Sequence, residues 1–528
     1  MPVSQGRFRA RRVGADCHDR AVLLAQLVET SAAVTATRSR LAKRALLAGA
    51  LRDAGDDEVE IVASYLSGRP RQRRTGVGWR GLADPPEPAT NPSLTPVGVD
   101  AALERISALA GTGSQAARAA AVAALFTAAT TAEQQFLRGL LFGELRQGAL
   151  DSLLLDAIAE AADVPLATVR RAAMFSALSG PIAAAALTGG AEALGEFRLE
   201  VGRPVRPMLA ATAPDVGAAL DKVGGRVAAA DGKIDGIRIQ VHRDRDEVAV
   251  FTRSLDDITD RLPEVVEVAR ALPVDAVVLD GEAVALGPDG RPRPFQETGS
   301  RTGSRDGAAL REEVPLTAYF FDLLHLDGRD LIDAPAHERF AVLADVAAAH
   351  LVPRRVTADP VEVAAFFQEM IDAGHEGLVI KDLQAPYDAG RRGAAWVKVK
   401  PRHTLDLVVL AVEWGSGRRQ RWLSNIHLGA RDGAGGFVML GKTFKGMTDE
   451  MLTWQTERFL ALETGRHGHV VTVRPEQVVE IAFDGIQRSS RYPGGMALRF
   501  ARVVRYRDDK SADEADSVET VRAIAGSA

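Results

Sequence analysis

Apolar and polar positions alternate with different periods in different parts of the chain. Over residues 1–200 apolar side chains recur every three or four positions, as in DRAVLLAQLVET and DSLLLDAIAEAADV, which is the period of an amphipathic helix. Loops rich in proline, glycine and arginine separate these stretches at 67–81 and 82–96. The pattern predicts an all-α domain over residues 1–200.

The pattern changes after an extended linker that begins at Gly202. Runs of β-type residues, such as RIQVHRDRDEVAVFTRS and AVVLDGEAVAL, are mixed with helical stretches such as PEVVEVARAL. We therefore predict an α+β domain over 203–402, with TGSRTGSRDGAA at 298–309 as a mobile loop. Beyond it, short strands with one helix near TDEMLTWQTERFLAL predict a small β-barrel of OB-fold type over 403–528.

Composition narrows the class of protein. A length of 528 residues with 46% hydrophobic and 26% charged residues is typical of a multi-domain globular chain. The net charge of -5 gives no overall positive field, so binding to nucleic acid would have to come from local basic patches. The single cysteine, Cys17, excludes intramolecular disulfides and a zinc site of several cysteines. Because no apolar run of about 18 residues is present, we expect a cytoplasmic protein without a membrane segment.

The octapeptide DGKIDGIR at 231–238 is the most informative short segment for chemistry. The amine of Lys233 can attack a phosphorus atom only when it is deprotonated, and nearby cations, a metal or burial would lower its pKa toward that state. Gly236 would let a ligand approach the backbone closely, and Arg238 would hold a charged or hydroxylated group beside the lysine. Taken alone, the segment is equally compatible with a solvated hairpin turn.

The pattern K-x-D-G-x-R resembles the nucleophile motif of the covalent nucleotidyltransferases, which comprise DNA ligases, RNA ligases and mRNA capping enzymes. Segments similar to the other motifs of that family follow in order: FTRS with Arg253, DGE with Glu282, YFFDLLHLDG with Phe321, EGLVIK from Glu376, and the segment from Tyr387 to Lys400. The C-terminal RFARVVRYRDDK resembles the ligase motif R-F-P-R-x-x-R-x-R-x-D-K. The resemblance to ATP-dependent DNA ligases covers 203 to about 512, and more weakly the helical third.

The resemblance implies a role for each matching residue. Lys233 would take up AMP within a motif that includes Asp235 and Gly236, and Glu282 and Glu376 would hold Mg²⁺, for which Mn²⁺ could substitute. The other contacts to ATP are implied for Asp231, Arg238, Arg253, Glu282, Phe321, Arg392, Lys398 and Lys400, with Phe321 stacking on adenine and the two lysines on one strand face meeting the triphosphate. The C-terminal motif, which would orient pyrophosphate, supplies Arg499, Arg502, Arg507, Asp509 and Lys510.

Two departures from the family pattern are visible. Ala501 stands where relatives carry proline, which would only stiffen the strand entry, so we expect a minor structural effect. Asp231 stands where most relatives carry glutamate, and its shorter side chain makes a contact to the adenine amino group less secure.

A separate match is expected to be without function. GFVMLGKT at 436–443 satisfies the P-loop pattern, but its intervening residues are all apolar and predict a strand in place of a phosphate-binding turn.

Two arginine clusters are candidates for contacts to DNA phosphates, and solvated loops are the alternative for both. They are Arg69, Arg71, Arg73 and Arg74 in one loop, and Arg418, Arg419 and Arg421 beside Trp414 and Trp422.

The resemblance favours one substrate class. A single cysteine argues against the NAD-dependent ligases with their four-cysteine zinc site, and the helical third argues against capping enzymes. We therefore expect a monomeric, nucleoid-associated ligase that seals nicked duplex DNA with ATP. The alternatives are an RNA-directed ligase or guanylyltransferase, and a catalytically silent nucleic-acid clamp.

Overall fold

The computed structural model describes residues 22–526 apart from 73–74, 83, 146, 148–150 and 305–309. It divides the chain into two compact units, Met1–Pro207 and Met208–Ala528. The expected boundary near residue 402 falls inside the second unit and stays a prediction.

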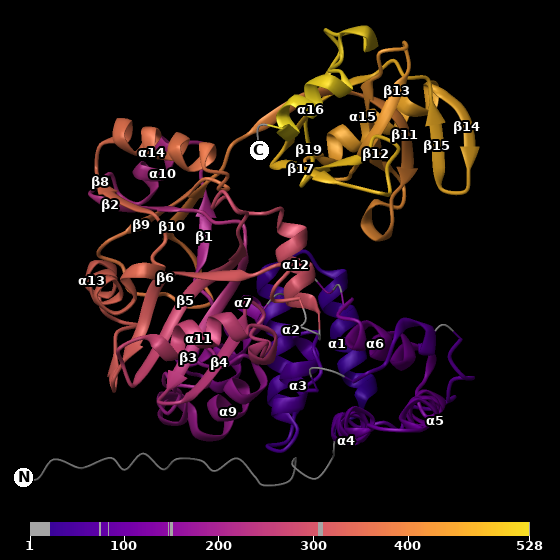
Figure 1. Ribbon diagram of the computed structural model, residues 1–528. Helices are drawn as coiled ribbons and strands as arrows, with labels where there is room; N and C mark the ends of the chain where they lie inside the picture. The colour runs from indigo at the N-terminus through magenta and orange to yellow at the C-terminus, as the bar shows by residue number, and fades with distance from the viewer. Residues whose placement is uncertain are drawn as a thin grey trace, which may run out of the picture. The chain divides into compact units, whose positions relative to one another are not determined.

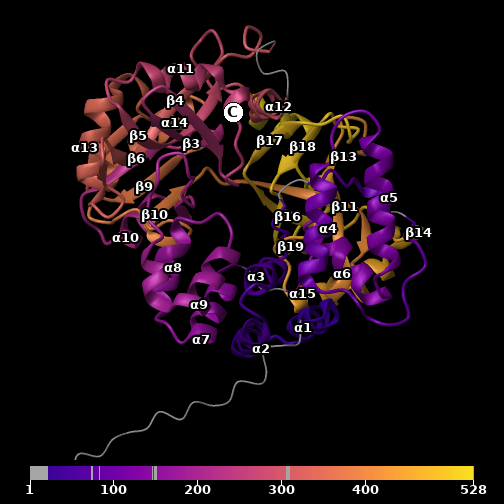
Figure 2. The ribbon, with the colours of Figure 1, turned by 90° about the horizontal axis from the view of Figure 1, so that it is seen from below.

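The described part of the first unit is helical and contains no strand, as the 3.6-residue period predicts. Thr130 caps the N-terminus of helix α6: its hydroxyl accepts from the N–H of Glu133, and the Glu133 carboxylate accepts from the N–H of Thr130. Apolar faces of the helices form one core, and α4, α5 and α6 lie together in both views (Figures 1 and 2). The helices are α1 (Leu24–Ala36), α2 (Arg40–Asp53), α3 (Val59–Leu66), α4 (Pro96–Ala108), α5 (Ser114–Thr127), α6 (Thr131–Leu141), α7 (Asp151–Ala162), α8 (Leu166–Met174) and α9 (Gly180–Gly195).

Two five-stranded sheets form the first part of the second unit. The first has the order β1-β10-β9-β2-β8 and the second the order β4-β3-β5-β6-β7. The strands are β1 (Leu209–Thr212), β2 (Ala228–Gly232), β3 (Ile237–Asp244), β4 (Glu247–Thr252), β5 (Ala276–Ala285), β6 (Leu316–Leu326), β7 (Arg329–Asp330), β8 (Arg354–Thr357), β9 (Leu378–Asp382) and β10 (Arg392–Val399).

Helices cover these sheets through their apolar faces. Helices α10 (Val216–Lys222) and α14 (Pro360–Asp372) pack against the first sheet and each other (Figure 1). Helices α11 (Pro263–Ala271) and α13 (Ala336–Ala347) pack against the second sheet. Each sheet therefore has its own apolar core.

The last part of the chain is rich in strands. A seven-stranded sheet has the path β13-β12-β11-β15-β14, with β16 joined to β11 and to β19, and β17 pairs with β18. The expected helix is α15 (Asp449–Ala461), and α16 (Val518–Gly526) follows near the C-terminus. The strands are β11 (His403–Trp414), β12 (Leu423–Arg431), β13 (Phe437–Thr443), β14 (Glu463–His467), β15 (Val470–Val473), β16 (Val478–Phe483), β17 (Gly485–Arg488), β18 (Met496–Arg499) and β19 (Arg502–Arg507).

One local expectation is wrong and one is confirmed. Residues 298–303 belong to helix α12 (Phe295–Gly303) because the buried Arg301 pairs with Glu264 at 2.9 Å, which holds a glycine-rich segment against the core; 305–309 lie outside the described residues. The P-loop match falls on β13, a strand paired with β12, as predicted. Among the described residues, no helix is long and apolar enough to span a membrane.

Candidate active site

Strands of both five-stranded sheets line one pocket with a volume of about 190 Å³. Its wall includes Leu209 and Ala210 of β1 and Trp396 of β10. Eight residues singled out from the sequence line it: Asp231, Lys233, Arg238, Arg253, Glu282, Phe321, Arg392 and Lys398. Segments up to 189 residues apart along the chain, from Leu209 to Lys398, thus meet at one concave surface.

Lys233 lies on the loop after β2, where the backbone fixes its position. Its N–H donates to the carbonyl of Gly377 at 2.8 Å, and the N–H of Glu376 donates to the carbonyl of Lys233 at 2.8 Å. This backbone pairing brings the Lys233 amine into an ion pair with the carboxylate of Glu376. Lys400 donates to the other oxygen of Glu376 at 2.8 Å, so one carboxylate holds two lysines.

The expected lowering of the Lys233 pKa is not found. Burial would lower the pKa, but the carboxylates of Glu376 and Glu282 outweigh burial, and the pKa is raised above its ordinary value. Burial alone would raise the pKa of the Glu376 carboxyl, but the positive charges of Lys233 and Lys400 lower this pKa to about 2. The resting amine is therefore protonated and paired.

Glu282 is the second carboxylate beside the lysine. It lies opposite Arg238 in the β3–β5 pairing. Burial raises the pKa of Glu282 to about 7, a shift that the charges of Lys233 and Arg238 oppose only in part. Across the part of the chain that the structure describes, no group of three or more His, Cys, Asp or Glu side chains is placed to hold a metal. Any cation here would depend on two carboxylates and on ligands from outside the protein.

Asp231 lines the pocket and is 2% exposed. Arg354 donates to its two oxygens at 2.5 and 2.8 Å, and Lys381 approaches one of them at 2.7 Å. Burial would raise the pKa of Asp231, but Lys381 and Arg354 together lower it. The carboxylate expected to face adenine thus already has two cationic partners.

Two aromatic rings, those of Phe321 and Trp396, lie next to this charged cluster. The rings of Phe321 and Trp396 meet edge to face with centroids 5.8 Å apart. The Lys381 amine lies 4.5 Å from the Phe321 centroid and 4.3 Å from that of Trp396. Such a set offers a flat apolar surface next to hydrogen-bonding groups, as nucleobase binding requires.

Two further residues of the nucleophile motif have close neighbours within the protein. Gly236 does permit a close approach, but to the β5 backbone: a Cβ there would clash with the carbonyl oxygen of Ala283 and lie 2.8 Å from Cγ of Glu282. Arg238 lines the pocket, yet its guanidinium donates to Asp280 at 3.0 and 2.6 Å and to the carbonyl of Met208 at 2.7 Å. Most of its hydrogen-bonding capacity is therefore used inside the protein.

Lys398 and Lys400 lie at the end of β10 beside Lys233. Lys398 pairs with Val379 of β9 and lines the pocket, whereas Lys400 follows the strand and binds Glu376. Burial, and then the charges of Lys400 and Lys233, lower the pKa of Lys398. Several cations therefore converge on a small volume, which favours an anionic ligand.

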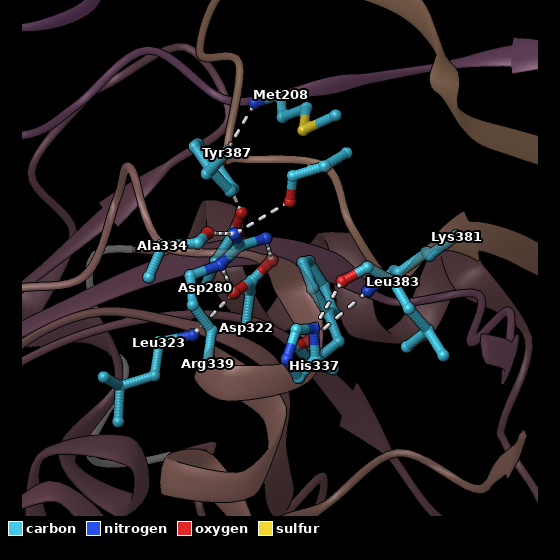
Figure 3. Close-up of polar contacts among 12 residues, drawn as sticks. Met208, Asp280, Asp322, Leu323, Ala334, His337, Arg339, Lys381, Leu383 and Tyr387 are labelled. Carbon is cyan, nitrogen blue, oxygen red and sulfur yellow. Dashed lines mark hydrogen bonds and ion pairs between the residues drawn. The ribbon is translucent and has the colours of Figure 1, made fainter. Parts of the chain in front are cut away.

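A second buried pair supports the site from behind. Asp322 and Arg339 have fully buried side chains and bond at 2.7 and 3.1 Å, and Arg339 also donates to the carbonyl of Ala334 (Figure 3). A further bond runs from Arg339 to the carbonyl of Ala385. Through Ala385 this pair fixes the chain between β9 and β10, which precedes Trp396 and Lys398.

Comparison with known proteins decides the family. The family described as "ATP dependent DNA ligase domain" matches residues 207–400, "ATP dependent DNA ligase C terminal region" matches 419–510, and "DNA ligase N terminus" matches 82–159. A protein of Beutenbergia cavernae named "Probable DNA ligase" is 65% identical over 96% of this chain and 100% of its own length. The chain belongs to the ATP-dependent DNA ligase family. The predicted family is thereby confirmed.

Other comparisons agree with this family. A "Probable DNA ligase" of Mycolicibacterium gilvum is 60% identical over 95% of this chain and 99% of its own. The solved structure "Pmar-Lig_PreS3" covers 91% of this chain and 99% of its own with TM-score 0.61 and 18% identity. At that identity the likeness concerns the fold alone, a ligase fold with a helical N-terminal region and a strand-rich C-terminal region.

The C-terminal ligase motif is divided between two places. Arg499 donates to Asp235 of the nucleophile loop at 2.8 Å. Farther along, Arg502 binds Asp484 at 3.1 Å, whereas Arg507 and Lys510 both bind Asp406, at 3.0 and 2.6 Å. Asp509 pairs with Arg507 at 2.6 Å. Arg499 therefore contacts the nucleophile loop, whereas the other four residues of the motif pair with residues of the strand-rich part of the chain.

The two arginine clusters differ in how far their charges are already paired. Arg69 is exposed, but Arg71 binds Asp100 and approaches Glu60 at 3.5 Å; Arg73 and Arg74 lie outside the described residues. Arg419 donates to the carbonyl of Phe444 at 2.7 Å.

In the second cluster two exposed guanidinium groups remain near the surface. That of Arg418 lies 3.6 Å from Asp449, and that of Arg421 lies over the ring of Trp422 at 4.3 Å.

Several residues of the site were not selected from the sequence. Lys381 and Tyr387 lie inside segments that resemble the family motifs, so these two residues could have been predicted from the sequence. Arg354 lies in none of the motifs, and the residue with which it pairs, Asp231, is 123 positions away in the sequence. Only the fold reveals it.

Proposed function

We propose that this ligase seals nicks in duplex DNA with ATP, by way of AMP carried on Lys233. The observation that carries the proposal is the ion-paired Lys233 in a pocket that combines an aromatic surface, carboxylates and clustered cations. That combination suits a purine nucleotide whose α-phosphorus lies next to an amine.

The pocket residues suggest a role for each part of ATP. Phe321 would stack on the adenine, with Asp231 below the base edge. Arg253 and Glu282 would contact the ribose, while Arg392, Lys398 and Lys400 would neutralise the phosphates. Arg238 would act mainly by shaping the pocket wall, since its guanidinium is bonded to Asp280 and Met208.

Glu282 and Glu376 have the chemistry to hold Mg²⁺ or Mn²⁺. Both present carboxylate oxygens, which are the donors that hard divalent cations prefer, and both act on the charge of Lys233. When bound, the ion would neutralise phosphate charge and compete with Lys233 for Glu376.

The reaction would consist of three phosphoryl transfers. The Lys233 amine, after losing its proton, forms a bond to the α-phosphorus as the bond to pyrophosphate breaks. An oxygen of the 5′-phosphate at the nick then takes AMP from the lysine. Finally the 3′-hydroxyl attacks that 5′-phosphorus, AMP leaves, and the strand is continuous.

The strand-rich C-terminal part would act as an OB-fold domain that moves between steps. Arg499, beside Asp235, would guide the leaving pyrophosphate, together with Arg502, Arg507, Asp509 and Lys510 once their pairs on the domain's own surface open. We expect a monomer, because one chain supplies every residue of the pocket.

Labelled nucleotides test this proposal. The protein is incubated with α-labelled ATP, α-labelled GTP or adenylate-labelled NAD and Mg²⁺, and then given a duplex with one nick in DNA or in RNA. A covalent label from ATP alone, followed by sealing of nicked DNA, is the expected result. Labelling by GTP would indicate a guanylyltransferase, RNA-only sealing an RNA ligase, and no label at all a silent clamp.

A second prediction concerns Arg418 and Arg421. Replacing both with glutamine should weaken binding to nicked duplex and reduce the slope of log affinity against log salt by about 1.8, or about 0.9 per lost phosphate contact. Self-adenylation should not change. Binding is measured by fluorescence anisotropy over a salt series.

The control is the double variant Arg270→Gln, Arg329→Gln, which removes two exposed charges that do not line the pocket. An equal change of slope in both double variants would show that net charge alone governs binding.

A further inference from the structure

Tyr387 is a large polar side chain that the proposed reaction does not use. It lies between β9 and β10, is 1% exposed, and does not line the pocket. Its ring stands edge-on to Trp396, which does line the pocket, with centroids 5.7 Å apart. Tyr387 thus supports the pocket wall from behind.

The Tyr387 hydroxyl joins three groups. It donates to Asp280 at 2.6 Å and accepts from the N–H of Met208 at 3.0 Å (Figure 3). It also accepts from Arg238 at 3.2 Å. A phenol has one O–H and two lone pairs, so this hydroxyl has no capacity left. Burial and then Asp280 raise the pKa of Tyr387 well above its ordinary value, which keeps the hydroxyl a donor.

Met208 is held on both sides of its backbone. Its N–H donates to Tyr387 and its carbonyl accepts from Arg238 at 2.7 Å. The next two residues, Leu209 and Ala210, line the pocket and pair with Arg392 and Gly393 of β10. Met208 is also the first residue of the second unit, so the first three residues of that unit form this part of the pocket wall or support it.

We propose that Tyr387 is a positioning residue for ATP, acting through Arg238 and the segment Met208–Ala210. Its hydroxyl fixes the Arg238 guanidinium and the backbone of Met208 together, and so sets the distance between the β1 wall and the opposite strands. Without the hydroxyl, the Met208 N–H and one Arg238 N–H lose their partner in a buried place. The wall then has to be ordered by the nucleotide itself. This inference rests on the proposed function, since it assigns ATP to the pocket.

The test is Tyr387→Phe in the full chain, which keeps the ring against Trp396 and removes only the hydroxyl. The rate of Lys233–AMP formation is measured over a series of ATP concentrations. The half-saturating ATP concentration is expected to rise about tenfold, while the limiting rate stays within about threefold, because the hydroxyl orders the binding wall and touches no reacting atom.

The matched control is Tyr65→Phe. Tyr65 is also a fully buried tyrosine, on α3 of the helical unit, and it neither lines the pocket nor belongs to a nucleotide motif. Its variant should keep the wild-type ATP dependence. If both variants show the same ATP dependence, or if Tyr387→Phe lowers only the limiting rate, the positioning role is overturned. If wild-type protein forms no AMP adduct, the proposed function fails instead.

A measurement on wild-type protein covers the case in which Tyr387→Phe does not fold. Hydrogen–deuterium exchange followed by mass spectrometry reports on the Met208 amide, which is the group bonded to the Tyr387 hydroxyl. Slow exchange is expected. Exchange as fast as in an unprotected peptide would contradict the network on which the inference depends.

Discussion

Replacing Lys233 with alanine is expected to abolish the transfer of AMP from ATP to the protein. The Lys233 amine lines the pocket and is held beside Glu376, and the neighbouring Lys398 and Lys400 are placed to bind phosphates. Loss of a covalent nucleophile lowers the rate by a factor on the order of 10⁴ or more. Labelled ATP, followed by denaturing gel electrophoresis, measures the adduct.

Two comparisons separate lost chemistry from lost structure. Lys222→Ala, which removes an exposed lysine of α10, should be labelled like the wild type. Lys233→Ala should still seal a nick that already carries AMP on its 5′-phosphate, because that last transfer needs no lysine nucleophile. An adduct that persists in Lys233→Ala would assign AMP to another residue.

The largest loss of stability is expected from Gly377→Ala. Gly377 follows Glu376 with φ +131°, and a Cβ there would clash with the carbonyl oxygen of Val399 and lie 3.1 Å from Cα of Lys400. Overpacking costs about 1–3 kcal/mol and a non-glycine residue at such a φ about as much again, so the free energy of unfolding should fall by roughly 2–6 kcal/mol. Urea denaturation of the full chain measures it.

Gly377→Ala should also impair labelling by ATP in the protein that remains folded. The carbonyl of Gly377 accepts from the N–H of Lys233, so a shift of this backbone moves the nucleophile relative to Glu376. Gly393→Ala is the control in the same sheet, because a Cβ there meets nothing closer than 3.9 Å. Equal stability of the two variants would mean that the backbone near Glu376 adapts more freely than its contacts indicate.

Short motifs predicted much of the pocket because they hold residues whose chemistry the family shares. The segments around Lys233, Glu282, Phe321 and Lys398 come to one surface, as expected: Lys233 follows β2, Lys398 is the last residue but one of β10, and Glu282 and Phe321 lie within the paired strands β5 and β6. The helical period in the first 200 residues likewise predicted helices that the structure contains. The roles of these residues in catalysis stay predictions.

What could not be predicted depends on pairing across the fold. The Asp231–Arg354 pair joins residues of two adjacent strands, and Asp322–Arg339 joins a strand to a helix, so neither leaves a local pattern. The direction of the Lys233 pKa shift also required the structure: burial and nearby cations were expected to lower the pKa, but the carboxylates of Glu376 and Glu282 raise it by more than burial lowers it. The helix over 298–303 was missed because its glycines and serines suggested a loop.

The ion pair of Lys233 with Glu376 also affects how readily other reactive compounds can modify this lysine. A protonated amine is a poor nucleophile, so the resting protein should be inert toward the reactive acyl and carbonyl compounds that modify exposed lysines. The Lys233 amine would become reactive only after a triphosphate binds the surrounding cations and Glu376 pairs with a group other than Lys233. The same contact that lowers the nucleophilicity of the resting amine thus protects it until its substrate binds.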